Sequence, residues 1–70
     1  MSMTKEEIKS WLLQVLERQT EHIKTHMDNV LYHLEEERDW KNAAEEQRKV
    51  DYWLSRAKNT MRLLEEEDLV

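Results

Sequence analysis

The sequence predicts an all-α fold, on the grounds of composition, apolar periodicity and a helix-start motif. The 70 residues include no Gly, Pro, Cys or Phe, and charged residues make up 39% of the chain. Because strands and tight turns depend on Gly and Pro, a chain rich in Glu, Lys, Gln, Leu and Met favours helices throughout. We expect a single domain over residues 1–70, an antiparallel helical hairpin that dimerises into a four-helix bundle.

The first predicted helix covers about residues 4–37. Thr4 can cap its N-terminus and Glu7, three residues later, can bond back to Thr4, which is the pattern of a capping box. Apolar side chains then recur at spacings of 3, 4 or 7, so they share one face of a helix. These side chains are Ile8, Leu12, Leu16, Ile23, Met27, Val30 and Leu34.

The second predicted helix covers about residues 43–67, after a turn at about 38–42. Its predicted contact row alternates spacings of 3 and 4 without exception. The row consists of Trp40, Ala43, Gln47, Val50, Leu54, Ala57, Met61 and Leu64. A charge placed at Leu54 is therefore expected to unfold the hairpin.

A break between the two helices follows from the angular positions of the two apolar rows. At 100° per residue, they would lie on nearly opposite sides of one continuous helix. Asp39 or Asn42 can cap a new helix after the break. The alternative is one long helix in an extended coiled coil, which is the usual competitor for heptad sequences.

The N-terminal turns of the first helix are predicted to lack partners within the chain. With the turn centred near residue 40, antiparallel packing pairs positions whose numbers sum to about 80, so Leu64 meets Leu16 and residues 1–11 meet nothing. An uncovered Trp-Leu cluster on a helix is typical of an interface, with a second copy or with a different protein. The predicted partner or dimer interface is Ile8, Trp11, Leu12 and Val15.

A basic stripe on the second helix is a further candidate contact, for a partner protein or for nucleic acid. A basic stripe with an aromatic residue is typical of a phosphate-binding helix, but the net charge of −5 argues against a polyanion; the stripe can also dock an acidic protein surface. The acidic blocks Glu35–Glu37 and Glu65–Asp68 suggest another alternative, an acidic inhibitor that mimics DNA. The contact residues of the stripe are Arg48, Tyr52, Arg56 and Arg62.

The histidines offer only weak metal candidates. His22 and His26 are separated by four residues, a spacing that can bind zinc, but a zinc site needs three or four protein ligands. We expect no metal, no cofactor and no catalytic residue, because a hairpin of this size has no interior wide enough for a catalytic pocket.

These observations favour a binding protein over an enzyme. Two helices of this size have close to zero net stability alone, so a second copy is expected to stabilise them. The longest apolar run, Trp11-Leu12-Leu13, is far shorter than the roughly 20 residues that span a membrane. We expect a cytoplasmic accessory protein that acts as a small regulator, adaptor or inhibitor by occluding or bridging a partner protein.

Overall fold

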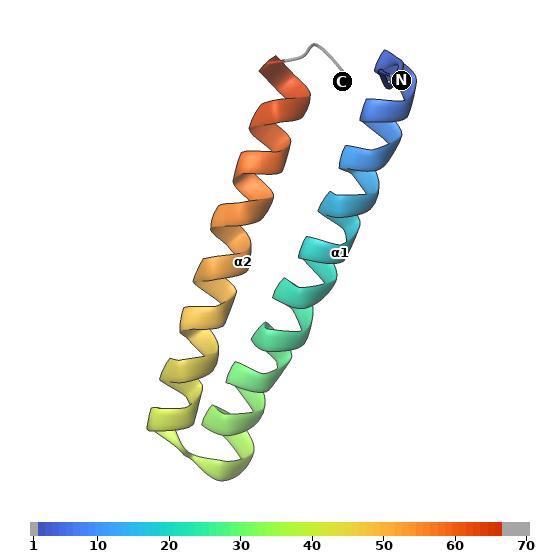
Figure 1. The fold of residues 1–70 in the computed structure, drawn as a ribbon. Coiled ribbons are helices and arrows are strands. Elements are labelled where there is room, and N and C mark those ends of the chain that lie inside the picture. Colours follow the sequence, from blue (N-terminus) through green and yellow to red (C-terminus); the bar gives the residue numbers. More distant parts are fainter. Residues whose placement is uncertain (1, 67–70) are drawn as a thin grey trace.

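The computed structural model describes residues 2–66, which form two long antiparallel helices joined by a short turn (Figure 1). Helix α1 spans Lys5–Tyr32 and helix α2 spans Trp40–Glu66, with a π-helical turn, η1 (His33–Glu37), between them. The particle measures 51 × 20 × 16 Å, whereas one continuous helix of 70 residues would extend about 100 Å. The predicted all-α hairpin is therefore confirmed, and the single long helix is not.

The start of α1 has the capping box that the sequence predicts. The Glu7 backbone N–H donates to Thr4 Oγ1 at 3.1 Å, and the Thr4 backbone N–H donates to Glu7 Oε1 at 3.2 Å. Two of the N–H groups that a helix start leaves unpaired are thereby satisfied.

The turn between the helices is closed by backbone hydrogen bonds at Arg38 and Asp39. The backbone N–H groups of both residues donate to the carbonyl of His33, and Arg38 adopts the left-handed conformation with φ 53° and ψ 38°. Glycine usually occupies such a position because it has no Cβ; a chain without glycine places an arginine there, at a cost of roughly 1 kcal/mol.

Helix α2 begins at Trp40, before the predicted position 43. Asp39 caps it, because Asp39 Oδ1 accepts from the Asn42 backbone N–H at 3.1 Å while Oδ2 accepts from the Asn42 side-chain amide at 2.8 Å. Of the two predicted caps, Asp39 is therefore the one used, and Asn42 lies inside the first turn. The predicted end near residue 67 lies outside the described residues.

The contact row of α2 differs from the predicted row in every second position. The heptad-spaced residues Ala43, Val50, Ala57 and Leu64 are buried, as predicted. The positions between them are Glu46, Trp53 and Thr60, whereas the predicted Gln47, Leu54 and Met61 are exposed. Apolar residues lie on both sides of the buried row, so periodicity alone cannot decide which side faces α1. The charge at Leu54 is accordingly no longer expected to unfold the hairpin by itself.

The register between the helices also differs from the prediction. Four pairs define it, and their residue numbers sum to 72–79 rather than 80: Leu12 with Leu64, Gln19 with Thr60, His22 with Trp53, and His26 with Glu46. The physical reason is the short turn, which is centred at residues 38 and 39. The shift places Leu12 opposite Leu64, where Ile8 and Leu16 pack on the pair. The expectation that Ile8 lacks intrachain cover was therefore wrong, and Leu12, at the margin of the predicted uncovered segment, is buried.

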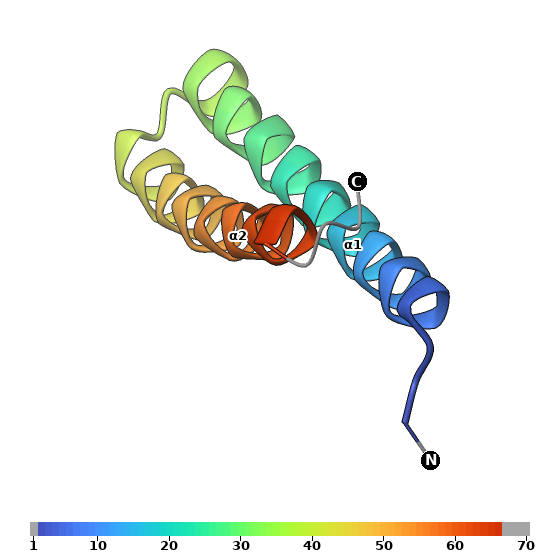
Figure 2. The ribbon, with the colours of Figure 1, turned by 90° about the horizontal axis from the view of Figure 1, so that it is seen from above.

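The helices lie further apart at their free ends than at the turn (Figures 1 and 2). Small Ala43 lies near the turn, while Leu12 and Leu64 pack at the open end, and larger contact side chains hold helix axes further apart. The wider spacing leaves room for a groove beside the contact row at this end. Across the described part of the chain, neither helix has an apolar stretch long enough to cross a membrane.

Candidate functional site

A groove runs along one flank of the hairpin, between α1 and α2, and is the main candidate site. Two adjoining hollows share Val15, Gln19 and Arg56, so they form one continuous depression. We refer to it as the groove; its principal lining residues are Trp11, Val15, Arg18 and His22 from α1, and Trp53, Arg56, Asn59 and Leu63 from α2.

The floor of the groove contains a buried polar pair. Thr60 Oγ1 donates to Gln19 Oε1 at 2.8 Å, and both side chains are buried. An unpaired buried amide would cost about 1–3 kcal/mol, so any slip of one helix along the other that separates this pair is penalised. The pair thus favours one register over its neighbours. Neither Gln19 nor Thr60 was predicted as a contact from the sequence; a row of α2 that includes residues 46, 53 and 60 would have placed Thr60 in the contact.

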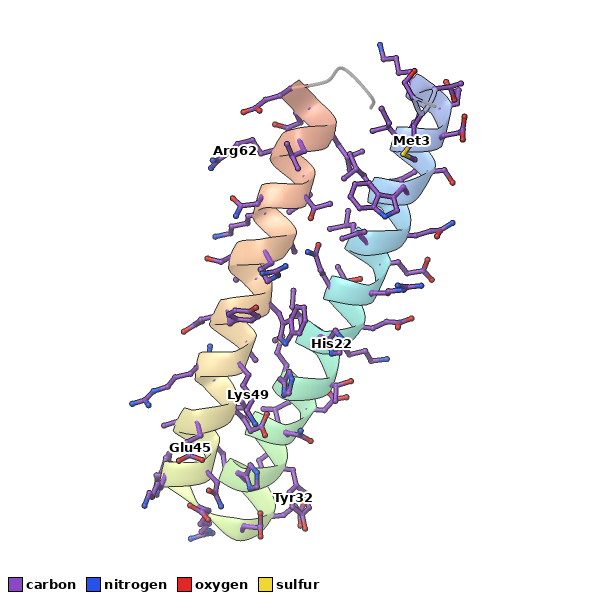
Figure 3. The ribbon with its side chains drawn as sticks, in the orientation of Figure 1. Met3, His22, Tyr32, Glu45, Lys49 and Arg62 are labelled. Carbon is purple, nitrogen blue, oxygen red and sulfur yellow. The ribbon has the colours of Figure 1, made fainter. Side chains whose placement is uncertain are left out.

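One wall of the groove is an aromatic stack across the two helices. The rings of His22 and Trp53 lie parallel, with centroids 4.2 Å apart and planes inclined by 11°. His22 projects from α1 toward α2 (Figure 3). The Tyr52 ring also contacts the Trp53 indole in an edge-to-face arrangement, with ring centroids 5.2 Å apart. Trp53 is therefore held from two sides, so the wall presents fixed aromatic surface to a ligand.

The four residues of the predicted N-terminal interface lie in two different environments. Trp11 lies at the open end of the groove with 56% of its surface exposed, and Val15 lines the groove one turn further along. Leu12 is buried and Ile8 packs against the cluster formed by Leu12 and Leu64. Trp11 and Val15 therefore remain candidates for binding a partner, whereas Ile8 and Leu12 stabilise the hairpin.

The predicted basic stripe is divided as well. Arg56 lines the groove, and its Nη1 donates to the Tyr52 hydroxyl at 3.2 Å while its guanidinium lies 5.5 Å from the Tyr52 ring centre. Arg62 points away from α1 (Figure 3), and Arg48 is exposed without lining the groove. Of the four residues, Arg56 is the one that lines the groove.

The two candidate metal ligands, His22 and His26, have separate partners. His22 stacks on Trp53, and the ring centroids of the two histidines are 6.5 Å apart. His26 Nδ1 lies 2.6 Å from Glu46 Oε2, and Lys49 Nζ lies 3.4 Å from Glu46 Oε1. Within residues 2–66, no three His, Cys, Asp or Glu side chains are grouped as metal ligands would be.

The His26–Glu46 contact gives the hairpin a predicted sensitivity to acid. The hydrogen bond to His26, assisted by Lys49, lowers the pKa of Glu46 below its usual value of 4.5, although burial opposes the shift. A carboxylate with a lowered pKa stabilises the fold above its unfolded pKa, and this contribution is lost as pH falls through the folded pKa. We therefore expect the free energy of unfolding to decrease below about pH 4.5, and Glu46→Gln to reduce that decrease.

Urea unfolding between pH 3 and pH 7 measures this effect. Glu45→Gln is the matched control, because Glu45 is an exposed neighbour that makes no ion pair within the described residues. An identical pH dependence in Glu46→Gln and in the unsubstituted chain would contradict the role assigned to the pair.

The opposite flank of the hairpin is mainly apolar on α1, whereas on α2 apolar residues alternate with polar ones such as Gln47 and Lys58. A hollow there is lined by Leu13, Leu16, Met61 and Leu64, with Glu65 at its edge. By helix position, other apolar residues of both helices continue along this side. We refer to it as the apolar flank; it comprises Leu13, Leu16, Ile23, Met27 and Leu31 of α1, Leu34 of η1, and Trp40, Leu54 and Met61 of α2.

The acidic blocks lie at the two ends of the hairpin. Glu35, Glu36 and Glu37 are exposed in η1, where Glu37 Oε1 lies 2.6 Å from His33 Nδ1. The second block, Glu65–Asp68, continues past Glu66 and so lies partly outside the described residues.

No known protein family, curated protein or solved structure matches this chain.

Proposed function

We propose that this chain is a non-enzymatic protein-interaction module, a small regulator, adaptor or inhibitor that works by occluding or bridging a partner protein. The observation that carries the proposal is an exposed tryptophan, Trp11, at the end of a groove between two helices. Tryptophan and arginine are the residues most enriched where binding energy concentrates in protein interfaces, and the groove contains both.

We also propose that two copies associate through the apolar flank into a four-helix bundle. The chain exposes 5754 Å², whereas a compact monomer of 8.6 kDa exposes about 4,700 Å². An elongated particle of 51 × 20 × 16 Å exposes more surface than a compact one, and a second copy along the apolar flank would cover part of it. In α1 the flank repeats at spacings of 3 and 4 with only Thr20 as a polar member, and this spacing suits helix packing in a bundle.

The two proposals assign the two flanks different partners. A second copy on the apolar flank would leave the groove open, because the two surfaces lie on opposite sides of the contact row. Nucleic-acid binding is less well supported, because Arg48 and Arg62 lie outside the groove and Arg56 is engaged by Tyr52.

Panning a random peptide library against the immobilised chain tests the groove as a protein-binding site. We expect the enriched peptides to lose at least about tenfold in affinity, roughly 1.4 kcal/mol, for Trp11→Ala and for Leu63→Glu. Trp40→Ala is the matched control, since Trp40 is also exposed but lies outside the groove. Peptides that bind the two groove variants with the same affinity as the unsubstituted chain would contradict the proposal.

A further inference from the structure

The groove flank differs in charge from the rest of the molecule. The chain carries a net charge of −5, yet the residues that face this flank on α1, from position 11 to position 29, include no carboxylate. They are Trp11, Val15, Arg18, His22, Thr25 and Asn29. On α2 the corresponding residues include Asn42, Lys49, Arg56 and Leu63, together with one exposed carboxylate, Glu45, five helical turns before Leu63. Glu46 borders them, but Lys49 Nζ lies 3.4 Å from its Oε1 and offsets its charge.

Two arginines from different helices meet in the same part of the groove. Arg18 of α1 and Arg56 of α2 both line the hollow beside the stacked rings of His22 and Trp53. Within residues 2–66 neither arginine forms an ion pair with a carboxylate. Arg56 is restrained by Tyr52, so less side-chain entropy is lost when it binds an anion.

The other end of the groove is apolar. Trp11 and Leu63 line it from α1 and α2, and both have large exposed surfaces. Trp11 precedes Arg18 by seven residues, and Leu63 follows Arg56 by seven, which is a separation of about 10 Å along each helix. The groove therefore offers an apolar pair and a cationic pair at a fixed separation.

We infer that the groove binds an acidic segment of the partner protein, with a large apolar side chain between Trp11 and Leu63 and carboxylates between Arg18 and Arg56. This inference rests on the proposed function and deepens it. At about 10 Å, the two groups would be three residues apart in an extended segment or seven residues apart in a helical one. A peptide suits the site better than a polyanion, because the apolar end gives phosphates nothing to bind and the acidic remainder of the chain repels them.

Charge reversal at Arg56 tests the inference. The same random peptide library is panned against the unsubstituted chain, Arg56→Glu and Arg62→Glu, the last being the control because Arg62 points away from α1 (Figure 3). For the unsubstituted chain and for Arg62→Glu, we expect the enriched peptides to be acidic. Each should carry a large apolar residue three or seven positions from an acidic residue. Arg56→Glu should weaken a synthetic copy of the best peptide by about tenfold and favour peptides without that acidic residue.

The indole N–H resonances of the three tryptophans locate the bound peptide. We expect the Trp11 and Trp53 resonances to shift on titration, with Trp40 unchanged as the internal control. Groove-dependent peptides without acidic residues would overturn this inference but leave the proposed function standing. Peptides whose affinity is unchanged by Trp11→Ala and Leu63→Glu would overturn both the inference and the proposed function. The absence of any enriched peptide would do the same. Binding of a short DNA duplex in competition with the peptide would also overturn the inference.

Discussion

Ala57→Asp is expected to unfold the hairpin. Ala57 is the most buried side chain described, with 2% of its surface exposed, in the heptad row that also contains Val50 and Leu64. A carboxylate at this position would be removed from water between two helices without a partner, and an uncompensated buried charge costs about 3–5 kcal/mol. A single core in a chain of this size rarely supplies more than about 3–5 kcal/mol, so this cost is enough to unfold the hairpin. Far-UV circular dichroism at 10 °C should therefore show loss of most helical signal.

Ala44→Asp is the matched control for this prediction. It makes the same substitution in the same helix at an exposed position, so helix propensity changes equally while no charge is buried. We expect its helical signal and midpoint temperature to remain close to those of the unsubstituted chain. If Ala57→Asp retained the same helical signal as Ala44→Asp, Ala57 would not lie in the contact between the helices.

Leu54→Glu is expected to convert a dimer into a folded monomer. Leu54 is 38% exposed on the apolar flank, where the proposed bundle would cover it. In a symmetric dimer the substitution introduces two charges into one interface. We expect the dissociation constant to rise at least about 100-fold, which corresponds to about 2.7 kcal/mol. Light scattering coupled to small-angle X-ray scattering should give twice the 8.6 kDa chain mass for the unsubstituted protein and the single chain mass for the variant.

Leu63→Glu is the matched control for the dimer interface. Leu63 is 47% exposed in the same helix, but it lies on the groove flank, so its variant should stay dimeric. An unsubstituted chain that is a compact monomer would contradict the bundle and leave the apolar flank available to a different protein. Loss of helicity in Leu54→Glu would show that the hairpin folds only when it associates.

The helices themselves could be predicted from the sequence because their signals are local. Thr4 and Glu7 specify the start of α1 through bonds three residues apart, and Asp39 starts α2 in the same way. The absence of Gly and Pro leaves few alternatives to a helix between these caps. The row from Ala43 to Leu64 could likewise be predicted, because burial every seven residues follows from helix geometry alone.

The candidate site could be predicted only in part. The sequence singled out Trp11, Val15 and Arg56, and all three line the groove. It could not bring them together, because α1 and α2 contribute them from positions some forty residues apart. Whether a groove forms between them depends on the register, which follows from the length of the turn at Arg38 and Asp39.

The side of each helix that faces its neighbour was decided by packing between the helices. Both flanks of α2 carry large side chains, Trp53 on one and Leu54 on the other, so hydrophobicity does not separate them. The choice depends on what α1 presents: Gln19, His22 and His26 need partners that Thr60, Trp53 and Glu46 can supply. An unpaired buried polar group costs more than an exposed leucine, so the side of α2 with Glu46, Trp53 and Thr60 turns inward and Leu54 remains on the surface.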